Sequence, residues 1–238
     1  MKSSNMAGER FARHWLITLA SILAAVPFAA GAVESARQEF TEAVGARPNL
    51  EHGAEIFRKC AACHGTSGNG SDDGNIPRLA GQHFRVLVRQ LVDYRYEKRW
   101  DIRMEHFAGR QLLVDSQSIA DVAAYVSQIS RDMPRNVGDG TLLPRGAKVY
   151  AQRCAECHGR LGEGENITMN PRLAGQHYQY LLRQMHDAVD GRRPNFSTAH
   201  LKVLSRLERD DLVGVADFLS RSEWNLPKSE QPVVAGLR

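Results

Sequence analysis

A short pattern of cysteine and histidine occurs twice in this chain, and it constrains the fold more than any other feature. The sequence CAACHG at residues 60–65 returns as CAECHG at residues 154–159, a shift of 94 positions. A second pattern, PRLAGQH, occurs at residues 77–83 and again at 171–177 with the same shift. Two separate segments that keep one spacing indicate a tandem repeat, in which each copy forms one structural unit.

The repeat divides the chain into two halves of similar length. They span residues 45–135 and 142–224, and the Gly- and Asp-rich stretch at residues 136–141 predicts a surface linker between them. In each half the apolar residues recur at helical spacing, as at Val122 and Val126, and neither half shows an alternating strand pattern. We therefore expect an all-α fold with a few helices in each half.

The chemistry of the repeat lies in its cysteine pairs, each of which is followed directly by a histidine. C-x-x-C-H is the attachment site of a c-type haem. Two thiols at this spacing can each form a thioether with the porphyrin, and the next residue offers an imidazole to the iron. A zinc site would need the two pairs close together, and disulfides would leave the histidines unexplained. We therefore expect two covalently bound haem c groups, held by Cys60, Cys63 and His64 in the first half and by Cys154, Cys157 and His158 in the second.

The first 32 residues predict a signal peptide. Basic residues at positions 2, 10 and 13 precede an apolar stretch at residues 15–30, and Ala-Gly-Ala at residues 30–32 is typical of a cleavage site. The apolar stretch is short for a membrane span, which needs about 20 residues. We expect cleavage after residue 32 and export to the periplasm. The alternative is an uncleaved anchor that holds the protein at the membrane, facing the periplasm.

The formal charge of +4 and the pI of about 9.0 do not indicate nucleic-acid binding. The predicted signal peptide carries three basic residues and one acidic residue, so its removal lowers the charge. The propionates of two haem groups would then make the mature protein slightly negative. The chain also has no basic run with interleaved aromatic residues of the kind that nucleic-acid binding uses. We therefore expect no nucleic-acid partner.

In these motifs the chain resembles the two-domain dihaem cytochromes c, which are cytochrome c4-like proteins with two class I cytochrome c folds in tandem. The resemblance covers nearly all of the mature sequence. Besides the C-x-x-C-H motifs, it rests on the Gly-x-x-x-aromatic leads at residues 53–57 and 146–150 and on the repeated PRLAGQ segments. It implies two cytochrome c-like domains, each wrapped round one haem. It also implies that the carbonyls of Pro77 and Pro171 accept hydrogen bonds from the proximal imidazoles.

The second axial ligand of each iron is harder to assign. This fold normally supplies a methionine from the loop before the last helix, and in the first half Met104 lies in that loop with His106 as its rival. The second half has no methionine after Met185, and its corresponding loop contains His200, which follows His106 by 94 positions. We expect Met104 and His200 as ligands. The alternative in the second half is an iron with an open position beside Phe196.

Other polar residues of the repeat have less specific interpretations. The histidines that follow each Gly-Gln pair, His83 and His177, favour a surface or capping role over ligation. Four arginines could pair with haem propionates or lie on the solvated surface: Arg78, Arg99, Arg172 and Arg193. The sequence favours neither of these two roles over the other.

Together these features predict a periplasmic dihaem c-type cytochrome that transfers electrons between redox partners, such as a dehydrogenase or a terminal oxidase. Electrons would enter at one exposed haem edge, cross between the halves and leave to a second protein. Peripheral association with the membrane is compatible with such a carrier. The alternative is a haem subunit of a periplasmic dehydrogenase, or a small haem oxidoreductase that acts at an open second iron.

Overall fold

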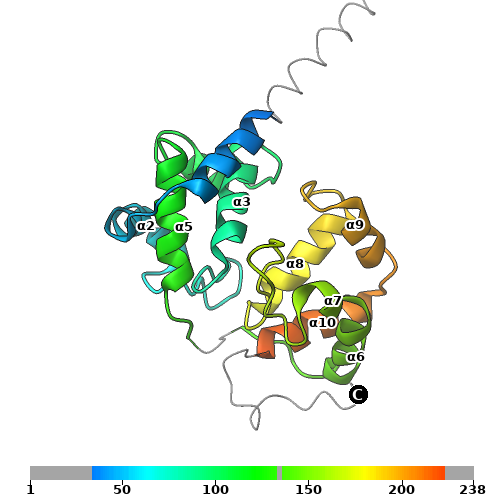
Figure 1. Cartoon of the computed structure of the whole chain (residues 1–238). Coiled ribbons are helices and arrows are strands. Elements are labelled where there is room, and N and C mark those ends of the chain that lie inside the picture. Colours follow the sequence, from blue (N-terminus) through cyan, green and yellow to red (C-terminus); the bar gives the residue numbers. More distant parts are fainter. Residues whose placement is uncertain (1–33, 133–135, 223–238) are drawn as a thin grey trace, which may run out of the picture.

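The computed structural model describes residues 34–132 and 136–222, and the predicted signal peptide lies outside them (Figure 1). The described residues form two groups of helices, one for each half of the chain. Their extended pairing is limited to an isolated bridge between Glu165 and Asn170. The predicted all-α fold is therefore confirmed. None of the described helices has the length and apolar character that crossing a membrane requires.

In the first half, the cysteine motif lies at the end of the helix that spans residues 50–64. The helices are α2 (Leu50–His64), α3 (Phe84–Arg95), α4 (Ile102–Ala108) and α5 (Ser116–Gln128). Asn49 caps α2, because its side chain accepts hydrogen bonds from the first backbone N–H groups of the helix. The buried carboxylate of Asp121 on α5 accepts from the Asn49 backbone N–H at 2.8 Å and contacts His52 Nδ1 at 2.7 Å. These bonds fix the start of α2 against α5.

The second half repeats this plan with one break. Its helices are α6 (Leu143–Arg153), α7 (Ala155–His158), α8 (Tyr178–Val189), α9 (Thr198–Leu204) and α10 (Arg209–Arg221). Tyr150 lies four residues before Cys154, whereas Phe57 lies three before Cys60. In a continuous helix, the extra residue would turn the second cysteine motif to a different face of the helix from the first motif. The helix instead breaks at Cys154, which lies between α6 and α7 with φ −122°.

Glycines allow the first and last helices of each half to cross closely. A Cβ atom on Gly53 would lie 2.2 Å from the Asp121 carbonyl oxygen on α5. A Cβ atom on Gly146 would lie 1.9 Å from the carbonyl oxygen of Gly214 on α10. Both distances are far below van der Waals contact, so each crossing depends on the missing side chain.

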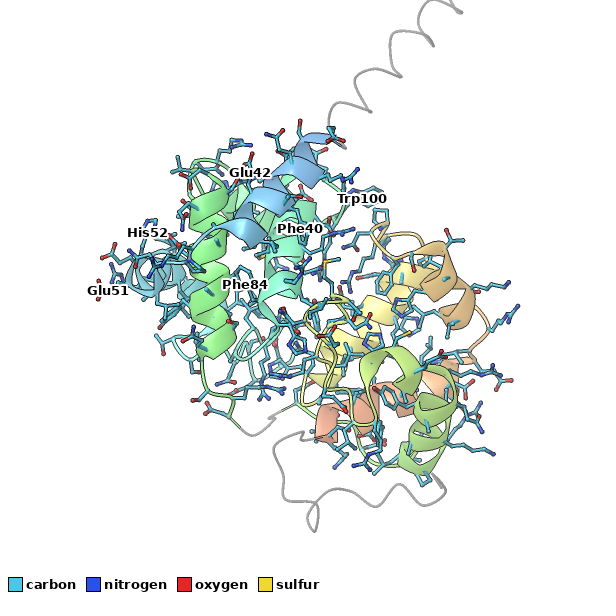
Figure 2. The ribbon with its side chains drawn as sticks, in the orientation of Figure 1. Phe40, Glu42, Glu51, His52, Phe84 and Trp100 are labelled. Atoms are coloured by element: carbon cyan, nitrogen blue, oxygen red, sulfur yellow. The ribbon has the colours of Figure 1, made fainter. Side chains whose placement is uncertain are left out.

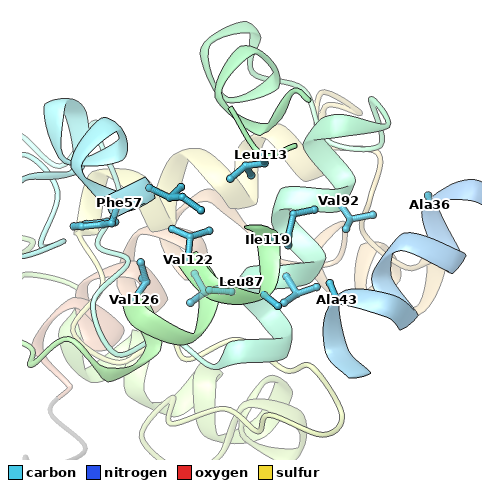
Figure 3. Close-up of a cluster of buried hydrophobic side chains, with 13 residues drawn as sticks. Ala36, Ala43, Phe57, Leu87, Val92, Leu113, Ile119, Val122 and Val126 are labelled. Atoms are coloured by element: carbon cyan, nitrogen blue, oxygen red, sulfur yellow. The ribbon is translucent and has the colours of Figure 1, made fainter. Parts of the chain in front are cut away.

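A further helix at residues 34–45 packs against the first half, and the hydrophobic spacing did not lead us to expect it. Ala36 and Ala43 on this helix are buried in the core of the first half, beside α3 and its residue Val92 (Figure 3). Phe40 is half-buried on the same helix, which also carries the exposed Glu42 (Figure 2). No counterpart of this helix precedes α6, because the linker occupies that place in the chain.

Candidate haem-binding sites

His64 is the last residue of α2 and is 6% exposed. Its Nδ1–H donates to the carbonyl oxygen of Pro77 at 3.0 Å, as the resemblance implied. Burial lowers the pKa of His64, although the Pro77 carbonyl acts in the opposite direction. The imidazole is therefore neutral near pH 7, with its proton on Nδ1. The lone pair on Nε2 is left to bind a metal.

His158 repeats this arrangement at the end of α7. It is 9% exposed, and its Nδ1–H donates to the carbonyl oxygen of Pro171 at 3.2 Å. Burial again lowers the pKa of the imidazole. The two proximal histidines therefore share their burial, their tautomer and their type of partner. This agrees with the equal roles that the sequence repeat predicts for them.

The cysteines lie beside these histidines and differ in exposure within each pair. Cys60 and Cys154 are half-buried, and Cys63 and Cys157 are exposed. Burial raises the pKa of both Cys60 and Cys154 to about 11, so these thiols are protonated near pH 7. None of the four, all of which belong to the described residues, forms a disulfide. On α2, Cys60 and His64 are one helical turn apart and share a face, as attachment to a single porphyrin requires.

The short helices α4 and α9 carry the two candidate distal ligands, Met104 and His200, at equivalent positions. Asp101 caps α4 and accepts from the Met104 backbone N–H, and Ser197 caps α9 and accepts from the His200 backbone N–H. Met104 and His200 are therefore both the third residue of a seven-residue helix. The structure pairs His200 with Met104, 96 positions apart, and not with His106 as the constant shift of 94 had suggested.

His106 is exposed and lies among local partners. Its ring contacts Phe107 edge to face, with 5.4 Å between centroids, and its Nδ1 lies 3.5 Å from the amide nitrogen of Gln111. Met104 is half-buried on the same helix. The charge of Asp101, which caps α4, raises the pKa of His64, and the charge of Arg103, the second residue of α4, lowers it.

In the second half, the structure brings the proximal and distal candidates together. The ring centroids of His158 and His200 are 5.9 Å apart, with an interplanar angle of 44°. Two imidazoles on opposite sides of one iron, each bonded at about 2 Å, would have centroids roughly 6 Å apart. Burial is the main cause that lowers the pKa of His200 to about 4, and His158 and Arg193 lower it further. Its neutral ring can therefore bind iron through a ring nitrogen, and His158 and His200 together fit a haem.

Phe196 is the residue beside which the alternative interpretation of the second half places an open iron. It is half-buried, and its ring centroid lies 4.6 Å from that of His200. The guanidinium of Arg193 lies over the Phe196 ring, 4.4 Å from its centroid. Phe196 therefore packs against both His200 and Arg193. Met185, whose predicted role was packing, lies among the apolar residues around the core of the second half.

The two PRLAGQH segments meet at the contact between the halves. Gln176 accepts from the Arg78 backbone N–H at 2.9 Å and donates to the Arg78 carbonyl at 2.8 Å. Gln82 makes the same two bonds with the backbone of Arg172, both at 2.9 Å. Each pair differs from the other by the shift of 94. The contact between the halves therefore follows a local two-fold relation.

Two histidines of the same segments also form hydrogen bonds between the halves, so the predicted capping role is wrong for both, and the predicted surface role is wrong for the buried His177 while His83 is half-buried. His83 Nε2 donates to the carbonyl of Glu163 at 2.9 Å, and His177 Nε2 donates to the carbonyl of Asn69 at 2.7 Å. Both residues precede a helix, but neither side chain caps it. His177 is only 2% exposed. The sequence could not reveal these roles, because the acceptors lie 80 and 108 positions away in the other half.

A second polar contact between the halves contains two of the predicted arginines. Arg99 is 6% exposed and donates to Gln90 in its own half and to Tyr180 and Gln184 in the other half. Arg193 donates to the same Gln90 oxygen at 3.4 Å. Arg99 is therefore no solvated surface residue, and neither is Arg78, which is 4% exposed. These guanidinium groups concentrate positive charge at the contact between the two halves.

Comparisons with known proteins agree with this geometry. The sequence model of the family described as Cytochrome c matches residues 50–130 and 143–221. Cytochrome c4 from Pseudomonas aeruginosa is 32% identical, over 67% of this chain and 82% of that protein. A thiosulfate dehydrogenase electron acceptor from Stutzerimonas stutzeri is 30% identical, over 68% of this chain and 77% of that protein. The crystal structure of reduced recombinant cytochrome c4 from Pseudomonas stutzeri superposes with a TM-score of 0.66 at 28% identity, covering 74% of this chain and all of that one.

Proposed function

Because this chain belongs to the cytochrome c family and is a dihaem c-type cytochrome of electron transfer, we propose that it conducts electrons between two unlike haems. The first haem would have methionine as its distal ligand and the second would have histidine. The observation that supports this most strongly is the 5.9 Å separation of the His158 and His200 rings. Among the residues that the structure describes, no second imidazole makes a ring contact with His64, and the residue of α4 equivalent to His200 is Met104.

The residues assigned to the two haem c groups would act as follows. Cys60 and Cys63 would attach the first haem, with His64 and Met104 as its axial ligands. The second haem would be attached by Cys154 and Cys157, with His158 and His200 as axial ligands. Each haem, when bound, supplies an iron that changes its oxidation state by one electron. The chain itself orients the imidazoles through the two proline carbonyls and buries both histidines.

The difference in distal ligand would set the direction of electron flow. A methionine ligand raises the reduction potential of a c-type haem, and a second histidine leaves it lower. Electrons would therefore enter at the second half and leave from the first. The two-fold contact around Gln82 and Gln176, together with the buried Arg99, holds the halves in a fixed relation for this transfer. Positive charge at this contact would also favour propionates that point toward it.

We assign the protein to the periplasm, with a dehydrogenase as electron donor and an oxidase as acceptor. A periplasmic location requires export, and the basic and apolar residues before position 32 predict the signal peptide that export needs. One relative is by its name the electron acceptor of thiosulfate dehydrogenase, which supports a dehydrogenase as partner. Fractionation of cells that express the whole chain separates a free periplasmic protein from one held at the membrane.

A carbon monoxide titration of the reduced dihaem protein tests the proposal. We expect no rapid binding to the wild-type protein, because both irons have a side chain on each face. The His200→Ala variant should bind one carbon monoxide per protein, and the matched variant His106→Ala should behave as the wild type does. A rapid, stoichiometric shift in the wild type would contradict the proposal. It would favour instead a haem oxidoreductase with an open second iron.

A further inference from the structure

We propose that Arg95 and Glu39 are positioning residues for the first haem site, because they hold α4 and the loop after it in place. This inference rests on the proposed ligation by Met104. We call the set of Arg95, Glu39 and the carbonyls of Ala108 and Leu113 the Arg95 clamp. It joins three parts of the first half: the helix at residues 34–45, the end of α3, and the segment that follows the ligand helix.

The guanidinium of Arg95 is the centre of this clamp. Its side chain is 5% exposed, although it stands at the end of α3. Nε donates to the carbonyl of Ala108, the last residue of α4, at 2.8 Å, and Nη2 donates to the carbonyl of Leu113. The last carbonyls of a helix have no partner within the helix, and a cation there is favourable. One side chain therefore closes the end of α4 and fixes the loop beyond it.

Glu39 supplies the charge that makes a buried guanidinium tolerable. Its carboxylate pairs with Nη1 of Arg95, and its own side chain is also 5% exposed. Burial lowers the pKa of Arg95, and the charge of Glu39 opposes this effect. Glu39 is held in place because Ala36 and Ala43, on the same helix, are buried in the core. The N-terminal helix thus reaches the ligand segment through the Glu39–Arg95 ion pair, and Glu39 also lies 3.5 Å from Nη2 of Arg110 in the loop after α4.

The described part of the second half, residues 136–222, makes the same fold without such a clamp. The residue of α8 that corresponds to Arg95 is Val189, which is 46% exposed. The loop that follows α9 spans only residues 205–208, whereas the loop that follows α4 spans residues 109–115. A longer loop has more conformations to lose, and a helix of seven residues is not stable alone. The clamp therefore compensates for a loop that is longer in the first half only.

The consequence for the first haem is kinetic as well as structural. Breaking one partner of a buried ion pair costs several kcal/mol in other proteins, because the remaining charge is left buried. If this cost falls on the α4 segment, its local opening becomes on the order of 100-fold more frequent. Met104 leaves the site whenever the segment opens. His200 is unaffected, because its helix has no such contact.

The test uses the mature dihaem protein and the variants Arg95→Met and Glu39→Gln. Glu42→Gln is the matched control, because Glu42 lies on the same helix but is exposed and bonds only Gln38 and Ser116. We would measure the near-infrared methionine-to-iron charge-transfer band and the rate at which added imidazole abolishes it. We expect imidazole to replace the methionine about 100-fold faster in Arg95→Met, and faster in Glu39→Gln, with no change in Glu42→Gln. Circular dichroism would show whether the halves stay folded.

The outcomes separate this inference from the ligand assignment. A band that is present in the wild type, is absent in Met104→Leu and has wild-type exchange rates in both clamp variants would overturn the clamp alone. A wild-type protein without the band would overturn ligation by Met104, and the clamp with it. If Arg95→Met does not fold, Glu39→Gln decides, because it keeps an oxygen that can accept from the guanidinium and removes only the charge.

Discussion

The close crossing of α2 and α5 makes a sharp prediction for a single methyl group. In Gly53→Ala the added Cβ would lie 2.2 Å from the carbonyl oxygen of Asp121 and 2.9 Å from Cβ of Tyr125. Ordinary contact distances begin about 1 Å further away, and the obstructing atom is backbone, which cannot rotate aside. The two helices must therefore separate, and the hydrogen bond from the Asn49 N–H to Asp121 lengthens with them.

The magnitude follows from two opposing effects. Overpacking of a fitted contact costs about 1 to 3 kcal/mol, and the backbone position of the clash favours the upper end. Replacing glycine by alanine inside a helix contributes about 1 kcal/mol in favour of folding. We therefore expect Gly53→Ala to lower the free energy of unfolding of the first half by about 2 kcal/mol.

Gly45→Ala provides the matched control, because a Cβ atom at Gly45 would have nothing within 4 Å. Because Gly45 is the last residue of its helix, the gain of an interior position does not apply there, so this variant should stay close to the wild type and the two variants should differ by about 2 kcal/mol. Urea denaturation of the haem-loaded protein, followed by far-ultraviolet circular dichroism, measures both. Equal denaturation midpoints for the two variants would refute the crossing argument.

Three further predictions concern the contact between the halves and the first ligand. Gln176→Leu leaves the backbone N–H and carbonyl of Arg78 without their partner, so the halves should unfold in separate transitions, with the contact weakened by about 2 to 3 kcal/mol in calorimetry. Burial lowers the pKa of His177 from its ordinary 6.5, so the unfolded chain binds more protons below that pH. Stability should therefore fall between pH 7.5 and 5.5, and the fall should shrink in His177→Gln, which keeps a donor for Asn69. Met104→Leu should lose the near-infrared charge-transfer band and lower one of the two reduction potentials in a redox titration; an unchanged band would exclude Met104 as a ligand.

The haem attachment residues could be predicted from sequence because their chemistry is local. Two thiols and an imidazole within five consecutive residues need no tertiary contact to be recognised. The helical class also followed from local spacing. The equivalence of His106 and His200 failed for a definite reason. The loop before α9, residues 190–197, is two residues longer than the loop before α4, residues 96–101, and a constant shift does not register this.

Other features required the folded chain. The helix at residues 34–45 has few strongly apolar residues, and two of its buried positions are the small Ala36 and Ala43. Its stability comes from packing, which local spacing does not report. His177 and Arg99 have local sequences typical of exposed residues, but their acceptors belong to the other half. A residue of this kind is buried by docking of the halves and not by its own neighbours in the chain.

The exchange of identical bonds between Gln82 and Arg172 and between Gln176 and Arg78 has a consequence for how such a chain can arise. Each half carries both a glutamine amide that bonds to a backbone in the other half and an arginine backbone that accepts and donates those bonds. Two separate copies of one half therefore already possess a self-complementary surface, as in a symmetric dimer. Joining them through residues 136–141 replaces an association that depends on concentration with one that is permanent. After that fusion, the two sites are free to diverge while their mutual geometry is kept.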